Sequence, residues 1–240
     1  MNRIVATMML TGALLANAAA AADLVVREVK GDVSVRHGVT ETWTPVKPGD
    51  LLKPDDTMRT GKGGSAVVTA RDPGGEVRKS ISLPPEVIVE MSDVRDLSQE
   101  ELMLKLTMER VRSAPPTRGG DGLTIPNATV VHGAQRGGGS AAGADDARTG
   151  TLLLNGSRAL FAAGFYSTCA LRTMDVLRRY PALAELPENR ILAAEALERA
   201  ELRSEALGEY AKILGAGGVS PAQKEKIEAR MALLRKSGAE

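Results

Sequence analysis

Between residues 24 and 91 the chain alternates apolar and polar positions with a period of two. Val33 and Val35, for example, stand between aspartate, serine and arginine. That period predicts strands with one buried face. Clusters of proline, glycine, aspartate and lysine separate the segments, at 47–50, 53–56 and 72–75. Short strands at this spacing predict a small antiparallel sandwich or roll.

A helical period first appears at residues 98–112. Ser98 and Glu101 have the spacing of a capping box, which predicts where the helix begins. Apolar residues then recur on one face, at Leu104, Met108 and Val111, with Leu102 and Leu106 alongside. We expect this helix to cover the β domain with that face, and the alternative is that the face docks a partner helix.

A change of composition marks a boundary at residues 135–150, which are rich in glycine and alanine and predict a flexible linker. Beyond it the period is helical throughout, with proline and glycine at the ends. Five amphipathic helices are predicted, at 152–163, 167–180, 188–200, 203–214 and 221–236. The expected fold class is α+β in two domains, an all-β domain at 23–134 that includes the helix 98–112, and an all-α domain of helical hairpins at 151–240.

Composition narrows the classes of partner. Hydrophobic residues make up 43% of the 240 positions and charged residues 25%, as in globular proteins. Aromatic residues are only 2% and the formal net charge is +1. A platform of stacked aromatic residues or a basic stripe for nucleic acid is therefore not expected.

The first 22 residues have the pattern of an export signal. Arg3 is followed by a mostly apolar run at 4–16, and alanines at 18–22 offer cleavage sites. Cleavage would leave Asp23 as the first residue of an exported, periplasmic or secreted protein without a transmembrane segment. The alternative is that residues 4–22 stay as an inner-membrane anchor.

The β region resembles the FecR-like domains of bacterial envelope proteins. The resemblance covers about Leu24–Met91 and rests on motifs in a fixed order: a glycine in the first strand region at Val29–Val35, then Trp43, Gly49-Asp50, Arg59-Thr60-Gly61 and Ser65–Ala70, and a hairpin at Asp72–Gly75. Ile125–Ala134 resembles a later strand of the family. The resemblance implies a β-rich module of the cell envelope.

The helical region resembles a pair of tetratricopeptide repeats. Cys169, Thr173 and Val176 align with Ala206, Tyr210 and Ile213 at a spacing of 37. The resemblance implies a groove lined by the first helix of each hairpin. It implies four candidate partner-binding residues, Arg158, Phe161, Glu195 and Glu198, and the alternative is that these only decorate a solvated face. Because two hairpins and a final helix make a short array, self-association through this domain is also possible.

Residues capable of catalysis or metal binding are few and scattered. His37, His132 and Cys169 have no spacing that predicts metal ligands or a Cys-His pair. Cys169 falls on an apolar helix face and is expected in the core. The glycine-rich turn at 61–65 lacks the spacing of a phosphate-binding loop. We therefore expect no enzyme activity, no cofactor and no metal.

Together these patterns predict a non-enzymatic binding or scaffold protein of the cell envelope. The expected partner is a protein or peptide, bound through the FecR-like domain and the helical groove. Two alternatives stay open at this point. One is a FecR-type signal-transduction regulator linked to an outer-membrane transporter, and the other is an accessory protein that binds cell-wall glycan.

Overall fold

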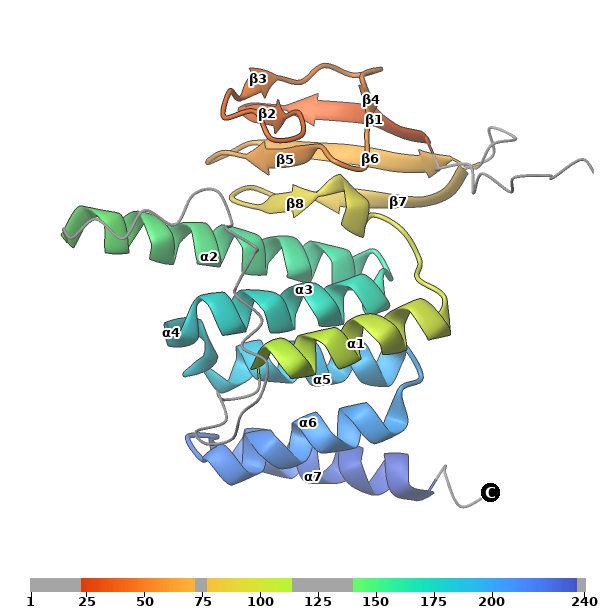
Figure 1. Ribbon diagram of the computed structural model, residues 1–240, viewed down its shortest axis with the longest axis vertical. Helices are drawn as coiled ribbons and strands as arrows, with labels where there is room; N and C mark the ends of the chain where they lie inside the picture. The colour runs from red at the N-terminus through yellow and green to blue at the C-terminus, as the bar shows by residue number, and fades with distance from the viewer. Residues whose placement is uncertain (1–22, 72–76, 114–139, 237–240) are drawn as a thin grey trace, which may run out of the picture.

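A computed structural model of the chain describes residues 23–71, 77–113 and 140–236 (Figure 1). The expected signal peptide, the expected strand at 125–134 and residues 135–139 of the expected linker lie outside these residues. The described residues form two antiparallel four-stranded sheets and seven α-helices, so the α+β class is confirmed. Figure 1 shows the sheets at one end of the molecule and the helices stacked beneath them.

The strands form a sandwich. One sheet contains β1 (Asp23–Lys30), β4 (Leu51–Leu52), β6 (Ser65–Arg71) and β7 (Val77–Leu83), in the order β4-β1-β6-β7. The other contains β2 (Val33–Arg36), β3 (Thr44–Pro45), β5 (Thr57–Thr60) and β8 (Ile88–Glu90), in the order β3-β2-β5-β8. The period of two places one face of each sheet inside, where the apolar side chains of both sheets are buried, among them Val26, Val68, Ile81, Val35, Met58 and Val89.

The turn after β5 explains the Arg-Thr-Gly motif. The Thr60 hydroxyl donates to the Pro84 carbonyl at 2.7 Å and accepts from the Val87 amide at 3.1 Å, so this threonine satisfies two backbone groups near the turn. A Cβ on Gly64 would lie 2.1 Å from the Asp32 carbonyl oxygen, although Gly64 has no positive φ. Glycine is needed there because two backbones meet, rather than for its conformational freedom.

The helices follow the last strand. A 3₁₀ turn, η1 (Met91–Asp93), leads to α1 (Gln99–Ser113). The remaining helices are α2 (Ser140–Ala162), α3 (Tyr166–Arg179), α4 (Pro181–Ala184), α5 (Pro187–Arg199), α6 (Arg203–Ala216) and α7 (Pro221–Lys236). Gly164 turns the chain between α2 and α3 with φ 81°. The six residues aligned at a spacing of 37 are all buried, on equivalent faces of α3 and α6.

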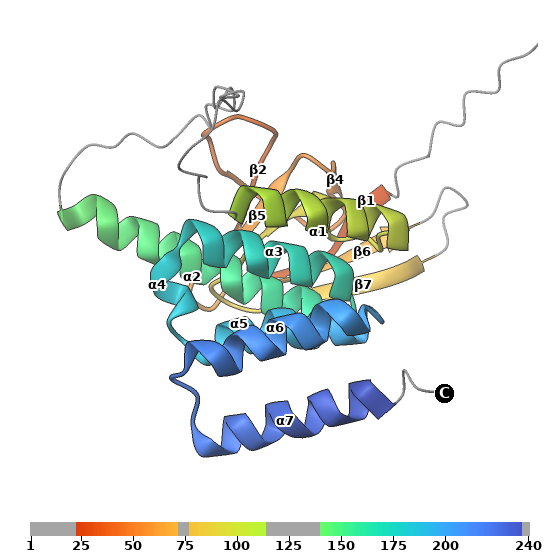
Figure 2. The same cartoon turned by 60° about the horizontal axis from the view of Figure 1, so that its bottom comes forward.

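The helix expected to cover the β domain does not do so. Helix α1 lies alongside α3 in both views (Figures 1 and 2) and buries Leu102 and Leu106. The apolar face expected to be buried is exposed, by 63% at Leu104, 48% at Met108 and 71% at Val111. Glu109 also lies on the buried side of α1, where it pairs with Arg178 of α3 at 2.6 Å.

The helix that does cover the sandwich is α2, which also corrects the expected linker, because residues 140–150 are helical. Helix α2 lies against β8 and β7, and Gly156 is where its backbone comes closest to β8. A Cβ there would stand 2.0 Å from the Ile88 carbonyl oxygen. Asn155 donates to the Glu86 carbonyl at 3.0 Å beside it. Gly150, expected to loosen the chain, instead brings the helix close to the ring of Tyr180.

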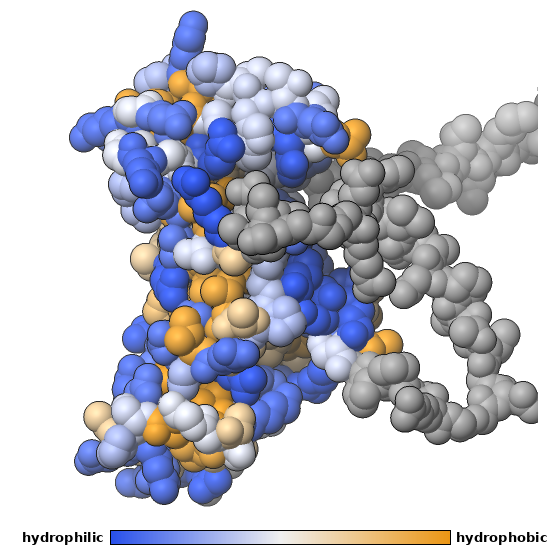
Figure 3. Space-filling view, turned by 90° about the vertical axis from the view of Figure 1, so that its left-hand side faces the viewer, coloured by the Kyte–Doolittle hydropathy of each residue, from blue (hydrophilic) through white to orange (hydrophobic). Residues whose placement is uncertain are grey.

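One cluster of buried apolar residues extends from the sandwich through the helices. From the side, apolar residues form a band down the helical layer with hydrophilic residues on both sides (Figure 3). Within the ranges that the structure describes, none of the helices combines the length and the apolar character needed to cross a bilayer.

Candidate functional site

The four residues predicted to bind a partner all have partners inside the chain. On α5, Glu195 pairs with Lys226 at 2.7 Å and Glu198 pairs with Arg230 at 3.0 Å, so both carboxylates hold α7. On α2, Arg158 donates to Asn189 at 2.8 Å. Phe161 is half-buried with its ring edge-on to Tyr166. The structure therefore does not bring these four residues together as one free surface.

Cys169 lies in the core, as the sequence predicts. It is 0% exposed, and burial raises the pKa of its thiol from 9.0 to about 12. His37 lies elsewhere, 2.9 Å from Asp56, and His132 is outside the described residues. Among the described residues no group of three or more histidine, cysteine, aspartate or glutamate side chains could hold a metal ion.

Cys169 should be unreactive in the folded protein, because the thiolate is the reactive form and the side chain is closed to solvent. We expect no measurable reaction with a disulfide reagent at about pH 8, and complete reaction of this single cysteine in guanidinium chloride at about 6 M. Absorbance of the released thiolate measures both. Reaction in the native state at the rate of a free thiol would contradict the burial.

The strongest candidate site is a groove of about 750 Å³ between the β3-β2-β5-β8 sheet and α2, which we call the junction groove. Its volume is within the range of about 300–1,000 Å³ that is usual for ligand sites. It is lined on the β side by Asp32, Arg36, Trp43, Thr57, Arg59, Thr60, Gly61, Lys62, Glu86, Ile88 and Glu90, and on the helical side by Arg148, Thr149, Leu152, Leu153, Arg179 and Tyr180.

Strand alternation places the arginines of the junction groove. Val35 and Met58 point into the sandwich, so the neighbouring Arg36 and Arg59 point outward from adjacent strands. Both guanidinium groups lie over the ring of Trp43, at 4.4 Å from the ring centroid for Arg59 and 5.4 Å for Arg36. These cation–π contacts hold two positive charges side by side on the sheet.

Cations outnumber carboxylates in the junction groove. Five cationic residues and three carboxylates line it. Glu90 is already paired with Arg172 at 2.6 Å, while Asp32 and Glu86 belong to the turns at either side of Gly61. Within the described part of the chain, four of the cations have no carboxylate within ion-pair distance, namely Arg36, Arg59, Lys62 and Arg148.

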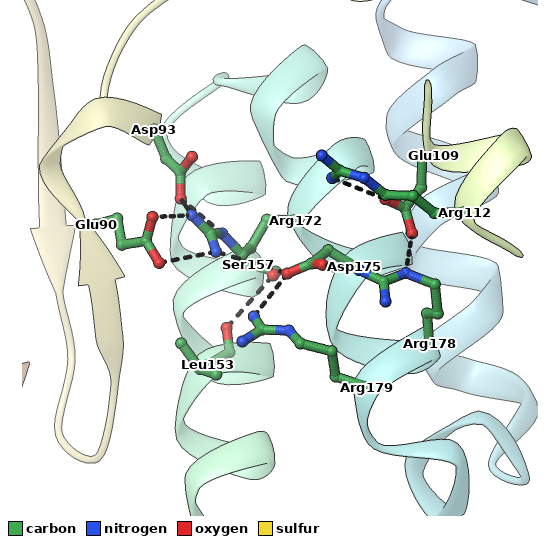
Figure 4. Close-up of polar contacts among 10 residues, drawn as sticks. All are labelled: Glu90, Asp93, Glu109, Arg112, Leu153, Ser157, Arg172, Asp175, Arg178 and Arg179. Atoms are coloured by element: carbon green, nitrogen blue, oxygen red, sulfur yellow. Dashed lines mark hydrogen bonds and ion pairs between the residues drawn. The ribbon is translucent and has the colours of Figure 1, made fainter. Parts of the chain in front are cut away.

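Behind the junction groove a network of ion pairs joins the sheet to the helices (Figure 4). Arg172 of α3 is its centre and contacts Glu90 at 2.6 Å, Asp93 at 2.7 Å and Asp175 at 3.8 Å. Asp175 also binds Arg179, at 2.6 Å, on the wall of the groove. The network therefore fixes the position of α3 relative to β8 and η1.

Three carboxylates of this network share Arg172. Burial raises the pKa of Asp93 from 3.8 to about 6; Arg172 opposes that rise and Glu90 adds to it. Burial alone would lower the pKa of Arg172, yet Asp93 and Glu90 hold it above its ordinary value. Arg172 is therefore always charged, and Asp93 is the group that responds to pH.

A smaller hollow of about 410 Å³ lies between α1 and α3 and is less suited to a charged ligand. Its walls include Arg95, Lys105 and Arg112, but each of these pairs with a glutamate of α1, Glu101 or Glu109. A ligand there would have to break existing ion pairs, whereas the junction groove offers cations that have no carboxylate partner among the described residues.

Sequence reasoning missed the junction groove, although one signal was present. Arginine occupies outward positions in two strands that pair with each other, and Trp43, the only tryptophan, precedes a third. Arg148 could not have been added to the set, because it was assigned to a linker. No family model, no curated protein and no solved structure matches the chain.

Proposed function

We propose that the chain is an exported, non-enzymatic binding protein of the cell envelope that holds a protein or peptide partner in the junction groove. One observation carries the proposal: four cations without carboxylate partners surround an aromatic ring in a groove of ligand-binding size, in the part of the chain that is described. Binding would involve both a FecR-like β module and a tetratricopeptide-like helical module, because each supplies one wall.

We propose the junction groove as the partner surface in preference to the helical face. Glu195 and Glu198 stabilise α7, so a partner that used them would have to displace Lys226 and Arg230. The cations of the junction groove need no such displacement. Preformed sites bind with a smaller entropic cost, which favours the groove over the face.

Site-specific photo-crosslinking in the envelope tests the proposal. A photoreactive phenylalanine derivative replaces Thr149, an uncharged wall residue, and separate proteins carry it at Phe161 on the helical face and at the fully exposed Val39. We expect one adduct of defined mass from position 149 that is lost when Arg59→Glu is added. An adduct from position 161 alone would restore the helical face, and equal labelling from position 39 would indicate random collision.

The proposal includes export, and the mass of the purified protein tests whether residues 1–22 have been removed. The protein recovered from the periplasmic fraction should begin at Asp23. Recovery of an intact 1–22 segment in the membrane fraction would favour the anchored alternative.

A further inference from the structure

We infer that the partner segment held in the junction groove is an acidic peptide in which aliphatic side chains stand between the carboxylates. The inference rests on the proposed function and names the chemistry of its partner. It follows from the unpaired cations, from the way two of them are held, and from the apolar residues between them.

The cations of the junction groove differ from the arginines behind it. The formal net charge is only +1, and arginines elsewhere at the junction are paired: Arg172 with Glu90 and Asp93, and Arg178 with Glu109. Against that background, four cations with no carboxylate partner among the described residues lie around one groove. Such a field attracts a ligand of negative charge and raises its association rate.

Trp43 prepares two of these cations for carboxylates. Arg59 and Arg36 lie over its ring, which fixes each guanidinium plane and leaves its N–H edges to donate. The Arg36 Nε atom is buried and has no hydrogen-bond partner among the described residues. A ligand carboxylate would instead accept from the terminal N–H groups of the two guanidinium groups.

The opposite walls require more than one negative charge. Lys62 lies in the turn after β5, while Arg148 lies on α2 across the groove. Between them the lining includes the aliphatic side chains of Ile88, Leu152 and Leu153. An acidic segment with leucine-like side chains matches both features, because carboxylates reach the two walls while aliphatic groups cover the floor.

A glycan fits this arrangement less well. Sugar rings are usually held by stacking on an open aromatic face. The guanidinium group of Arg59 lies 4.4 Å from the centroid of the Trp43 ring, and that of Arg179 lies 5.8 Å from the centroid of the Tyr180 ring. Both aromatic residues of the groove are thus engaged by arginine, which favours a ligand recognised by its charge.

Trp43 is the only tryptophan of the chain, so its fluorescence reports on the groove directly. The probe is a short synthetic peptide of alternating glutamate and leucine, titrated into the mature full chain. We expect a saturable change in Trp43 fluorescence that weakens several-fold as salt rises from about 50 to 200 mM. The peptide with glutamine in place of glutamate should give no change.

Two arginine variants supply the matched comparison. Arg148→Gln removes a cation from the wall opposite Trp43 and should weaken peptide binding about tenfold, the loss expected for one charge-assisted contact. Arg235→Gln removes an exposed arginine from α7 and should leave binding unchanged. Circular dichroism would show that both variants are folded, because neither side chain has an ion-pair partner among the described residues.

Each contrary outcome overturns the inference in a different way. Equal binding of the glutamine peptide would show that charge does not select the ligand. Binding of polygalacturonate, an anionic polysaccharide, without binding of the acidic peptide would assign the groove to a glycan. If no probe changes the fluorescence while position 149 still gives its adduct in the envelope, the acidic partner is wrong and the proposed binding function stands.

Discussion

Replacing Gly156 by alanine should destabilise the protein by about 2–3 kcal/mol, although alanine is the better helix former. The added Cβ would stand 2.0 Å from the Ile88 carbonyl oxygen and 3.0 Å from a methyl carbon of Val89, and the nearer of these atoms is backbone. Helix α2 could accept it only by moving away from β8, which would also strain the Asn155 contact to Glu86. Urea unfolding followed by circular dichroism measures the change.

Gly208→Ala is the matched control, because Gly208 lies within α6 and its added Cβ would meet no described atom within 4 Å. It should stabilise the protein by about 0.5–1 kcal/mol through helix propensity alone. The same substitution in two helices is thus expected to have opposite signs. A neutral or stabilising effect at Gly156 would show that α2 does not depend on close contact with β8.

Much of the secondary structure could be predicted because local chemistry determines it. The predicted 188–200 and 221–236 match α5 and α7 within one residue, since Pro187 and Pro221 stand at the first position of each helix. The strands could be predicted from the alternation of apolar and polar residues, because one face of each sheet is buried. For the helix starts and for the strands, the predictive pattern lies in residues that are neighbours in the sequence and does not depend on tertiary contacts.

The arrangement of the elements could not be predicted in the same way. Residues 140–150 look like a linker by composition, yet the glycine at 150 lies against a tyrosine that is thirty positions away. The prediction for the buried face of α1 was wrong. It chose the stripe that begins at Leu104, whereas the buried side carries Leu102, Leu106 and Glu109, and Glu109 pairs with Arg178 of α3. At these positions, tertiary contacts override the local pattern.

The candidate site shows the same division. Alternation alone places Arg36 and Arg59 on the outer face of one sheet, so half of the junction groove was within reach of the sequence. The other half depends on α2 crossing β8, a contact that requires Gly156 and leaves no periodic signal. The network of Arg172 was hidden for the same reason, because its carboxylates come from β8, η1 and α3.

Replacing Arg172 by methionine should destabilise the protein by about 3 kcal/mol at pH 7.5, because it leaves carboxylates unpaired at a buried junction. The Arg172 side chain is 14% exposed and that of Asp93 is 16% exposed, so solvent can compensate only in part. Methionine keeps most of the apolar stem and removes the charge. Urea unfolding between pH 5 and 8 measures the loss of free energy.

The pH dependence separates loss of charge from loss of packing. Since the pKa of Asp93 is raised to about 6, the folded state binds its proton more tightly than the unfolded chain, and stability falls as pH rises through 6. Without Arg172 that pKa should rise further, so the deficit of Arg172→Met should shrink as the pH is lowered toward 5. Asp93→Asn should remove most of the pH dependence, and Arg235→Met on exposed α7 should change stability by less than about 0.5 kcal/mol. If Arg172→Met lost the same free energy of unfolding at pH 5 and at pH 8, Arg172 would stabilise the junction by packing. Its carboxylate partners would then be solvated well enough to need no cation.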